Sequence, residues 1–569
     1  MQMAAQRILI IGGVAAGPKV AARARRLLPD AEITVIDKGR YISYAGCGMP
    51  FYIDDQVGHF RELFSTGYGL PRDAEYFRSE RGINFRTRTE ALFIDRARKE
   101  VLVRDLETGR QSRLGYDQLV LTIGAESVMP RIEGTDFAGV FKFRDPGDAQ
   151  TVKEYLEKRD VQEVVVVGAG FIGIELAGAL ANLKLLTTVI EFQEQILPLT
   201  LDPDMARLLE QRLAAAHGIE FRTGERVIRL EGDEQGRVCR VVTDRGGYDA
   251  ELVIMAVGVR PNVGLAREAG LAIGETGAIL IDEYCRTSDP DIYACGDCVE
   301  TTHRLTGQKV YAPFASAANR QGRVVADNLA GRRSVYRGVL GTAVLQAGSF
   351  NAGRTGLTEE QARRLGYEVV TSIVPQRDRT HYHPGSGMVI LKIIADRASG
   401  RLLGVQGIGP GEVVKRIDVA AAVLHFGGMV NDLIEMDLGY APPFNMPIDP
   451  LQHAANALVN KLDGIVETIS ADELKAKLDA DEDFVLLDVR LEKETRHRKI
   501  DDPRRILVTL GELRRRVHEI PRDKEIITIC DIGVRSYEAY RLLRGAGFAK
   551  VKSVEGGMRT WPYGPASMF

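Results

Sequence analysis

The sequence has few cysteines for its length and no long apolar run. Six cysteines in 569 residues do not make a disulfide framework, so their thiols are expected to be available for chemistry. The six are Cys47, Cys239, Cys285, Cys295, Cys298 and Cys530. No uncharged apolar stretch approaches the roughly 18 residues of a membrane helix, and residues 1–7 lead straight into the strand-like Ile8–Ile11 with no secretory signal. We therefore expect a cytoplasmic protein that does not contact a membrane.

An excess of charge of one sign is also missing. The formal net charge of −3 gives no indication of nucleic-acid binding, and 45% hydrophobic with 27% charged residues is ordinary for a globular protein. The chain is too long for one hydrophobic core and should fold as roughly three or four domains.

The first motif that is present is a glycine-rich turn near the start of the chain. Arg7–Gly17 reads RILIIGGVAAG, a helix-like stretch continues to Leu28, and Glu32–Asp37 reads EITVID. The spacing from Gly12 to Asp37 fits a dinucleotide-binding βαβ unit, although Val14 replaces the second glycine of the motif. The arginines of the helix, Arg23, Arg25 and Arg26, would by default form a solvated face; the alternative is a site for a phosphate-bearing substrate.

A second turn of this kind has all three glycines. Glu163–Glu175 reads EVVVVGAGFIGIE, with Gly168, Gly170 and Gly173 in the motif positions. The next strand, Thr187–Glu191, ends in an acid 23 residues after Gly168. An acid at this place binds the ribose 2′-hydroxyl and repels a 2′-phosphate, which favours NADH over NADPH.

Two further stretches contain cysteines, and each allows a functional and a structural interpretation. In Ser43–Pro50, SYAGCGMP, glycines flank Cys47 and would let a flat ring or a bulky thiol approach its sulfur, but a buried structural cysteine is the alternative. Cys295 and Cys298 form a C-x-x-C within DPDIYACGDC, which is either a redox pair or, as we favour, a pair of small buried residues.

The last two regions contain no nucleotide turn. Residues 336–460 mix strand-like and helix-like stretches and place Tyr382 and Tyr440 in proline-containing loops, where most tyrosines simply pack. Residues 468–569 read as a compact α/β domain in which Cys530 ends a strand just before a helix. Backbone N–H groups and the helix dipole there lower a thiol pKa, and Arg535 adds positive charge; the alternative is a cysteine that merely ends a buried strand.

Together these motifs resemble a known family along nearly the whole chain. Residues 7–460 resemble the coenzyme A–disulfide reductase branch of the pyridine nucleotide–disulfide oxidoreductases, with the Ser-x-x-x-Cys-Gly motif at Ser43–Gly48 and the Val14 variant of the first turn. Residues 468–569 resemble a rhodanese domain, with Asp488-Val-Arg490, a Cys-x-x-Gly-x-Arg-Ser loop at 530–536, and Gly556-Gly557 with Trp561. The fusion is typical of coenzyme A–disulfide reductase–rhodanese proteins, which are also described as NADH-dependent persulfide reductases.

The resemblance implies an α/β fold with two Rossmann-like domains, an α+β dimerisation domain and a C-terminal α/β rhodanese domain. The expected boundaries are 1–150 with 276–335 for FAD, 151–275 for NADH, 336–460 for dimerisation and 468–569 for rhodanese. The implied ligands are FAD, NADH and coenzyme A, and no metal is expected. With both turns included, the expected cofactor contacts are Gly12, Gly13, Gly17, Asp37, Lys38, Thr122, Gly124, Asp297, Gly168, Gly170, Gly173, Glu191 and Gly258.

The resemblance also implies roles at the reaction centre. Cys47 corresponds to the redox nucleophile beside the flavin, and Tyr382 and Tyr440 to tyrosines that reach the active site from the partner subunit of a homodimer. Cys530 and Arg535 belong to the sulfurtransferase loop. The implied coenzyme A contacts are Lys19, Arg23, Arg26, Ser43 and Asn319.

The expected activity is NADH-dependent reduction of persulfides or polysulfides, with coenzyme A persulfide as a substrate and the tail domain handling sulfane sulfur. Three alternatives remain open. They are a coenzyme A–disulfide reductase that maintains a thiol pool, an NADH oxidase or peroxidase cycling through a sulfenic acid, and a redox sensor that acts through its tail.

The acid of the second turn generates a prediction about the cofactor. NADH should exceed NADPH in kcat/KM by at least about tenfold, because a like-charge contact with Glu191 costs more than about 1.4 kcal/mol. Steady-state kinetics with the two cofactors measure this ratio, and equal values would refute the assignment of Glu191.

Overall fold

In the computed structural model, which describes residues 5–496 and 498–564, the chain divides into two units. Unit 1 comprises Met1–Gly168, Asn182–Leu185 and Val227–Val339, and unit 2 comprises Ala169–Ala181, Leu186–Arg226 and Leu340–Phe569. The boundary therefore falls inside the second glycine-rich turn. None of the helices in the described residues is both long and apolar enough to cross a bilayer.

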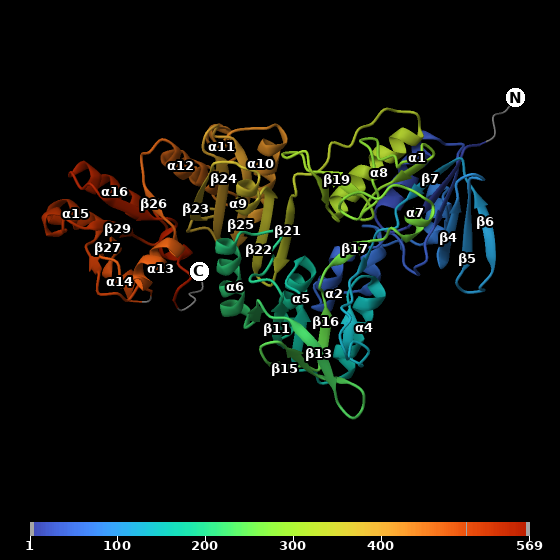
Figure 1. The fold of residues 1–569 in the computed structure, drawn as a ribbon, viewed down its shortest axis with the longest axis horizontal. Helices are drawn as coiled ribbons and strands as arrows, with labels where there is room; N and C mark the ends of the chain where they lie inside the picture. The colour runs from blue at the N-terminus through green and yellow to red at the C-terminus, as the bar shows by residue number, and fades with distance from the viewer. Residues whose placement is uncertain (1–4, 497, 565–569) are drawn as a thin grey trace. The chain divides into compact units, whose positions relative to one another are not determined.

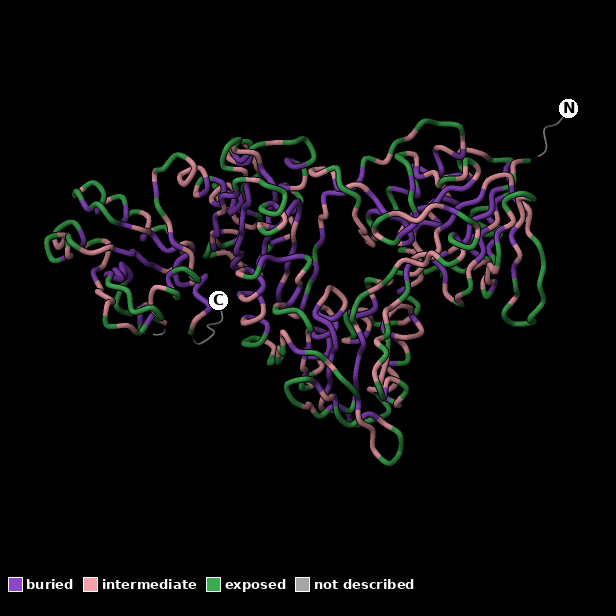
Figure 2. The backbone as a smooth tube through the Cα atoms, viewed as in Figure 1, coloured by how far each residue is buried: buried purple, intermediate pink, exposed green. Residues whose placement is uncertain are grey.

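The first glycine-rich turn belongs to a five-stranded parallel sheet of unit 1 with the order β18-β7-β1-β2-β3. Its strands are β1 (Arg7–Ile11), β2 (Glu32–Ile36), β3 (Asn84–Arg86), β7 (Gln118–Leu121) and β18 (Ile292–Ala294). Their Ile-, Leu- and Val-rich centres are buried on both faces, as in a covered parallel sheet (Figure 2). Helices α1 (Ala16–Leu27) and α8 (Ala315–Leu329) pack against each other beside it (Figure 1).

The remaining strands of unit 1 form smaller sheets. A parallel set contains β9 (Val140–Lys142), β16 (Leu252–Met255) and β10 (Glu163–Val167). The antiparallel strands are β4 (Thr89–Asp95), β5 (Glu100–Asp105), β6 (Gln111–Gly115), β8 (Ala125–Ser127), β13 (Val227–Gly232), β14 (Val238–Thr243), β15 (Gly247–Asp249), β17 (Val259–Pro261), β19 (Glu300–Thr302) and β20 (Lys309–Tyr311). The short helices are η1 (Gly46–Gly48), α2 (Met49–Ile53), η2 (Phe60–Phe64), α3 (Ala74–Arg81), α4 (Pro146–Lys158) and α7 (Gly264–Glu268).

Unit 2 contains an antiparallel sheet in the order β21-β22-β25-β24-β23. Its strands are β21 (Ala343–Ala347), β22 (Phe350–Gly356), β23 (Val369–Arg377), β24 (Met388–Asp396) and β25 (Leu402–Gly409). The associated helices are α9 (Glu359–Arg364), α10 (Val413–His425), α11 (Val430–Glu435) and α12 (Pro450–Leu462). The same unit holds β11 (Leu186–Glu191), α6 (Pro203–His217) and β12 (Glu220–Thr223), and α5 (Phe171–Asn182) follows the second turn.

The C-terminal part of unit 2 is a parallel sheet in the order β26-β30-β29-β27-β28. Its strands are β26 (Thr468–Ile469), β27 (Phe484–Asp488), β28 (Arg505–Leu507), β29 (Glu525–Ile529) and β30 (Val551–Val554). The helices are α13 (Ala471–Asp479), α14 (Glu492–Thr495), α15 (Leu510–Arg516), η3 (Val517–Glu519), α16 (Val534–Gly545) and η4 (Gly557–Thr560). The expected α/β fold class is confirmed.

Polar side chains of α6 hold this C-terminal domain. Arg207 donates to the Asp472 carboxylate at 2.7 Å and to the Tyr563 hydroxyl at 2.6 Å. Gln211, one turn further along α6, donates to the carbonyl oxygen of Pro562. The contact between α6 and the tail domain is therefore built in part from hydrogen bonds and an ion pair.

A buried lysine connects α6 with the antiparallel sheet. Lys392 on β24 is 1% exposed, and its Nζ lies 2.7 Å from Asp204, 2.9 Å from Glu359 and 3.2 Å from Asp202. Burial alone would lower the pKa of Lys392, but the three carboxylates outweigh it and raise that pKa above its ordinary value. The lysine is therefore charged and holds three acids together.

Removing this cation should destabilise the unit. Lys392→Met leaves buried carboxylates without their counter-charge, so the free energy of unfolding should fall by about 3–5 kcal/mol. Urea denaturation followed by circular dichroism measures the change. Arg364→Ala, which breaks an exposed ion pair with Glu360 on α9, is the matched control and should shift the stability by less than about 1 kcal/mol. Equal shifts in the two variants would contradict the assignment.

Candidate active sites

The first turn is shaped by two glycines that no other residue could replace without movement. Gly12 has φ +111°, and a Cβ there would overlap the carbonyl oxygen of Thr122. A Cβ on Gly17 would overlap the carbonyl oxygen of Gly12. The backbone therefore turns tightly at the end of β1 and approaches α1 closely, as a phosphate-binding turn requires.

The acid at the end of β2 secures this turn. Asp37 accepts hydrogen bonds from the N–H groups of Gly13 and Gly39, each at 2.6 Å. Burial raises the pKa of Asp37, while these two N–H groups oppose the rise. Lys38 is exposed beside it. The carboxylate thus lies where the dinucleotide fingerprint places its ribose ligand.

The other residues predicted to contact the first cofactor lie at the same edge of the sheet. Thr122 follows β7 and donates to the carbonyl oxygen of Gly12 at 2.8 Å, and Gly124 has φ +65°. Asp297 follows β18 and accepts a hydrogen bond from Arg144 at 3.2 Å. Arg144 also donates to the carbonyl oxygen of Ala125. Sequence reasoning missed Arg144, which precedes α4 and has no local motif to mark it.

Cys47 lies in the 3₁₀ turn η1 and is exposed. A Cβ on Gly46 would meet only the Tyr44 ring, at 3.7 Å, so that side of the turn is open. A Cβ on Gly48 would lie 3.0 Å from the side chain of Leu63, so this glycine serves packing instead. The expectation of an approachable sulfur therefore rests on Gly46 and on the exposure of Cys47.

The cysteine segment is attached to the first turn by its backbone. Ser43, at φ +49°, donates its N–H to the carbonyl oxygen of Gly13 at 2.8 Å. Cys47 follows Ser43 by four positions, so the cysteine is held near the nucleotide-type turn. This bond connects the sulfur site with the predicted flavin site.

Four of the five predicted coenzyme A residues lie on α1 and α8, and the fifth, Ser43, lies in the cysteine segment. Lys19, Arg23 and Arg26 lie on α1 and Asn319 on α8, and the packing of these helices brings them to one region. Arg23 forms a mostly buried ion pair with Asp327, with an Nε–Oδ1 distance of 2.8 Å. Arg26 and Asn319 are exposed. Arg23 therefore has its charge balanced within the protein, while Arg26 faces solvent.

The second turn repeats the design of the first. Gly168 has φ +104°, and a Cβ there would overlap the carbonyl oxygen of Ala256. Glu191 at the end of β11 accepts hydrogen bonds from the N–H groups of Ala169 at 2.7 Å and Gln193 at 2.8 Å. Like Asp37, Glu191 accepts one hydrogen bond from the glycine-rich turn and one from the N–H two residues after itself.

The other glycines predicted for the second cofactor differ in their surroundings. Gly173 is buried in α5, whereas a Cβ on Gly170 or on Gly258 (φ +109°) would meet nothing within 4 Å. Sequence reasoning missed Glu175 on α5, where burial raises the pKa to about 7 against a hydrogen bond from the N–H of Gln346. Burial thus makes the carboxyl group of Glu175 easier to protonate than an exposed glutamate.

Cys295 and Cys298 are fully buried in the core of the first sheet, and so is Cys285. Burial raises the pKa of Cys298 to about 12 and also raises the pKa of Cys295. Thiols of this kind are poor nucleophiles at neutral pH. The structure thus favours the interpretation of this pair as small buried residues.

The second sulfur site lies where β29 meets α16. Cys530 is 0% exposed, and its Sγ accepts a hydrogen bond from the N–H of Gly533 at 3.2 Å. The hydroxyl of Ser536 lies 3.5 Å from this sulfur and donates to the carbonyl oxygen of Gly533. Gly533 has φ +95°, which turns its N–H back towards the sulfur. The N–H of Gly533 is therefore placed to stabilise a negatively charged sulfur.

The positive charge that Arg535 adds beside the loop is balanced by an acid. Both of its terminal nitrogens contact the Glu494 carboxylate, at 2.8 and 2.6 Å. This pairing lowers the pKa of Glu494 to about 2 and raises that of Arg535. The pair fixes the end of the loop against α14. Sequence reasoning missed Glu494, whose separation of 41 residues gives no local indication of the contact.

Two glycines support the loop from the other side. Gly557 has φ +59°, and a Cβ there would overlap the carbonyl oxygen of Cys530, which accepts the N–H of Met558 at 2.8 Å. A Cβ on Gly556 would lie 3.1 Å from the ring of Pro375 on β23. The turn at Gly556 and Gly557, which supports the Cys530 loop, therefore packs against the antiparallel sheet that contains β23.

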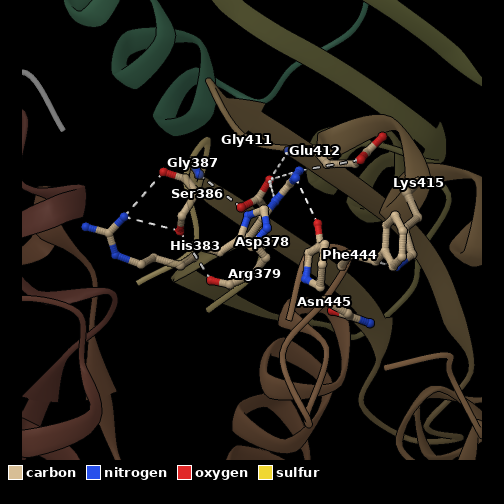
Figure 3. Close-up of polar contacts among 12 residues, drawn as sticks. Asp378, Arg379, His383, Ser386, Gly387, Gly411, Glu412, Lys415, Phe444 and Asn445 are labelled. Carbon is tan, nitrogen blue, oxygen red and sulfur yellow. Dashed lines mark hydrogen bonds and ion pairs between the residues drawn. The ribbon is translucent and has the colours of Figure 1, made fainter. Parts of the chain in front are cut away.

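The two predicted tyrosines lie on loops of that sheet domain. Tyr382 is 66% exposed and Tyr440 49% exposed. Phe444 and Ile448 are also exposed nearby in sequence. Figure 3 shows the polar contacts that surround these loops, including those of Asp378 and Asn445.

Family models match three parts of the chain. Residues 6–322 match pyridine nucleotide-disulphide oxidoreductase, residues 347–449 match the dimerisation domain of the same proteins, and residues 470–562 match the rhodanese-like domain. The first match covers both glycine turns, the second covers the tyrosine loops, and the third covers the Cys530 loop.

Individual proteins are similar over most of the chain. A NAD(P)H coenzyme A polysulfide/persulfide reductase of Pyrococcus horikoshii is 39% identical over 80% of this chain and 98% of its own length. The structure of a NAD-dependent persulfide reductase from A. fulgidus matches with a TM-score of 0.93 and 43% identity, over 98% of this chain and 100% of that one. Reduced Bacillus anthracis CoADR-RHD matches with a TM-score of 0.90 and 33% identity, over 98% of both chains.

The Arg535–Glu494 pair generates a prediction about the loop. Glu494→Gln removes the charge that orients Arg535, so kcat/KM for sulfur transfer from thiosulfate should fall about tenfold. In the wild type, the contribution of this pair is present above the ordinary carboxyl pKa and is lost only as the pH falls through about 2. A thiosulfate pH profile between 5 and 8 should therefore show no step from Glu494. Full activity in Glu494→Gln would contradict an orienting role.

Proposed function

Because the chain belongs to the pyridine nucleotide-disulphide oxidoreductase family and carries a rhodanese-like domain, we propose that it reduces persulfide or polysulfide sulfur to sulfide with electrons from NADH. The observation that carries the proposal is the exposed Cys47 on a segment tied through Ser43 to the first nucleotide turn. The relatives named for polysulfide and persulfide reduction support the choice of substrate.

The two glycine turns fit two dinucleotides. We assign residues 1–150 and 276–335 to binding FAD, 151–275 to binding NADH, 336–460 to dimerisation and 468–569 to the rhodanese domain. The close approach at Gly12 and the positioned carboxylate of Asp37 fit FAD, and Gly168 with Glu191 fits NADH. When bound, FAD carries electrons from the nicotinamide to sulfur. The further residues proposed to contact the cofactors are Gly13, Gly17, Lys38, Thr122, Gly124, Asp297, Gly170, Gly173 and Gly258.

Coenzyme A is the proposed thiol carrier. The exposed Arg26 and the half-buried Lys19 on α1 would bind its phosphates, and Ser43 and Asn319 would add hydrogen bonds. Arg23 would contribute through packing and its positive charge, although Asp327 already holds it.

Cys47 performs the sulfur chemistry. Its thiolate attacks the outer sulfur of a persulfide, a new S–S bond forms at Cys47, and the original S–S bond breaks to release a thiolate that takes up a proton. Two electrons and one proton then split the persulfide on Cys47 into the Cys47 thiolate and HS⁻. The net change converts RSSH, NADH and H⁺ into RSH, H₂S and NAD⁺.

Cys530 handles sulfane sulfur. Its thiolate takes a sulfur atom from a donor such as thiosulfate, which leaves sulfite, and the resulting persulfide is transferred to coenzyme A or to Cys47. The N–H of Gly533 stabilises the negative sulfur, and Arg535 with Glu494 holds the loop.

The exposed tyrosines complete the site in a homodimer. Tyr382 and Tyr440 are exposed on the domain that matches the dimerisation model, so their phenols are available to a second subunit. We assign them to the active site of the partner, where their hydroxyl groups would donate hydrogen bonds to the leaving thiolate.

The test of the reductase assignment is Cys47→Ser. This variant should retain FAD absorbance but lose at least about 100-fold in NADH-dependent reduction of coenzyme A persulfide, because serine cannot form the S–S intermediate. Substantial remaining turnover would transfer the chemistry to another cysteine. A higher kcat/KM for coenzyme A disulfide or for oxygen than for the persulfide would favour a disulfide reductase or an oxidase instead.

The division between the two cysteines is tested by Cys530→Ser. Sulfur transfer from thiosulfate should be abolished, whereas reduction of coenzyme A persulfide should stay within about twofold of wild type, because electrons enter only at Cys47. The two activities are measured side by side on the dimeric, FAD-containing protein. Loss of both would make Cys530 an obligatory relay and overturn this division.

A further inference from the structure

Two loops of the dimerisation domain carry the exposed tyrosines. The loop 378–387 connects β23 with β24 and contains Tyr382, and the loop 436–449 connects α11 with α12 and contains Tyr440. Loops with side chains this exposed are expected to be mobile unless polar contacts hold their backbones.

Hydrogen bonds connect the two loops directly. Arg379 donates to the carbonyl oxygen of Pro443 at 3.0 Å, and the hydroxyl of Thr380 donates to the carbonyl oxygen of Pro442 at 3.3 Å. Proline has no backbone N–H, so Pro442 and Pro443 can form these hydrogen bonds only through their carbonyl oxygens.

A single buried arginine lies beneath both loops. Arg416 on α10 is 1% exposed, and its Nη2 donates to the carbonyl oxygen of Asp378 at 2.8 Å and to Oδ1 of Asn445 at 3.0 Å. The same guanidinium forms an ion pair with Asp449 at 2.9 Å. An arginine presents five donors in a rigid planar fork, so its contacts to two loops and an acid have a fixed geometry that the single ammonium nitrogen of a lysine does not provide.

The residues contacted by Arg416 then hold the rest of each loop. The carboxylate of Asp378 accepts the N–H groups of Gly387 at 2.9 Å and Glu412 at 3.1 Å, so it closes the Tyr382 loop (Figure 3). Asn445 donates to the carbonyl oxygen of Gly439, which directly precedes Tyr440, at 3.2 Å. Both tyrosine loops are thus hydrogen-bonded to one guanidinium, the Tyr382 loop through Asp378 and the Tyr440 loop through Asn445.

We propose that Arg416 is a positioning residue for sulfur reduction, which holds Tyr382 and Tyr440 in the relative placement that the partner's active site requires. The proposal rests on the proposed function, in which these tyrosines enter that site. A purely stabilising role would need only the ion pair with Asp449, which caps α12, whereas the bonds to Asp378 and Asn445 point to the loops.

The conservative variant Arg416→Lys separates these two roles, because it keeps a positive charge for Asp449 and loses the fork. Coenzyme A persulfide reduction should fall about tenfold in kcat, since small displacements of catalytic groups cost rate steeply. NADH-dependent reduction of ferricyanide, which needs neither Cys47 nor the tyrosines, should stay within about twofold. The ratio of the two activities is the readout, because loss of folded protein lowers both equally.

Lys392→Met is the matched control, since Lys392 is equally buried and paired in the same domain but contacts neither tyrosine loop. Its activity ratio should equal that of wild type. If Arg416→Lys does not yield a folded dimer, Arg379→Gln with Thr380→Val breaks the bonds between the loops and should shift the ratio in the same direction. An unchanged ratio in the folded Arg416→Lys dimer, or, where that dimer does not form, in the double variant, overturns the proposal.

A double-mutant comparison distinguishes this proposal from the proposed function. In a Tyr382→Phe, Tyr440→Phe background, adding Arg416→Lys should reduce kcat by less than about twofold, because the arginine acts through the tyrosines. A further tenfold loss would overturn the positioning role while leaving the tyrosines in place. Full persulfide reduction in the tyrosine variant would instead refute their part in the proposed function, and the proposal with it.

Discussion

The structure depends on a carboxylate at the end of a strand that accepts the N–H of a glycine-rich turn. Asp37 does this for the first turn and Glu191 for the second, with nearly equal distances. The bond fixes a backbone that must be free of side chains to approach a phosphate, and it leaves the acid at the ribose position. Ser43 then binds the first turn through the carbonyl oxygen of Gly13. The backbone of the Cys47 segment is therefore attached to the first glycine-rich turn, where we propose that FAD binds.

Much of this arrangement was predictable because its determinants are local. The strands at Arg7–Ile11, Glu163–Val167 and Glu525–Ile529, the two glycine turns and the position of Cys530 before a helix all follow from short patterns. The ion pairs that hold charged side chains at the sites do not follow from such patterns. Arg144 and Asp297 are 153 residues apart, and Arg23 and Asp327 are 304 apart. No periodicity or spacing marks such partners, so they become visible only when the chain is folded.

Buried charges in the dimerisation domain illustrate a second limit of sequence reasoning. Lys392 and Arg416 lie in stretches that read as strand and helix interiors, where a charged residue suggests a solvated face. Both are instead enclosed with their acids. Removing one partner of such a group is costly, but replacing the whole group, cation and acids together, by apolar residues often preserves stability, so buried ion pairs contribute more to a specific arrangement than to net stability. Lys392 fixes the sheet relative to α6, and Arg416 fixes the tyrosine loops.

The contact between α6 and the tail domain has a further consequence. The side chains of Arg207 and Gln211 are polar. They can exchange their hydrogen bonds with the tail domain for hydrogen bonds with water at little cost in free energy. At the positions of Arg207 and Gln211, α6 would therefore expose polar and not apolar groups if the tail domain were absent. Modular inheritance, in which a sulfurtransferase joins an already complete reductase, is therefore compatible with the chemistry of this helix.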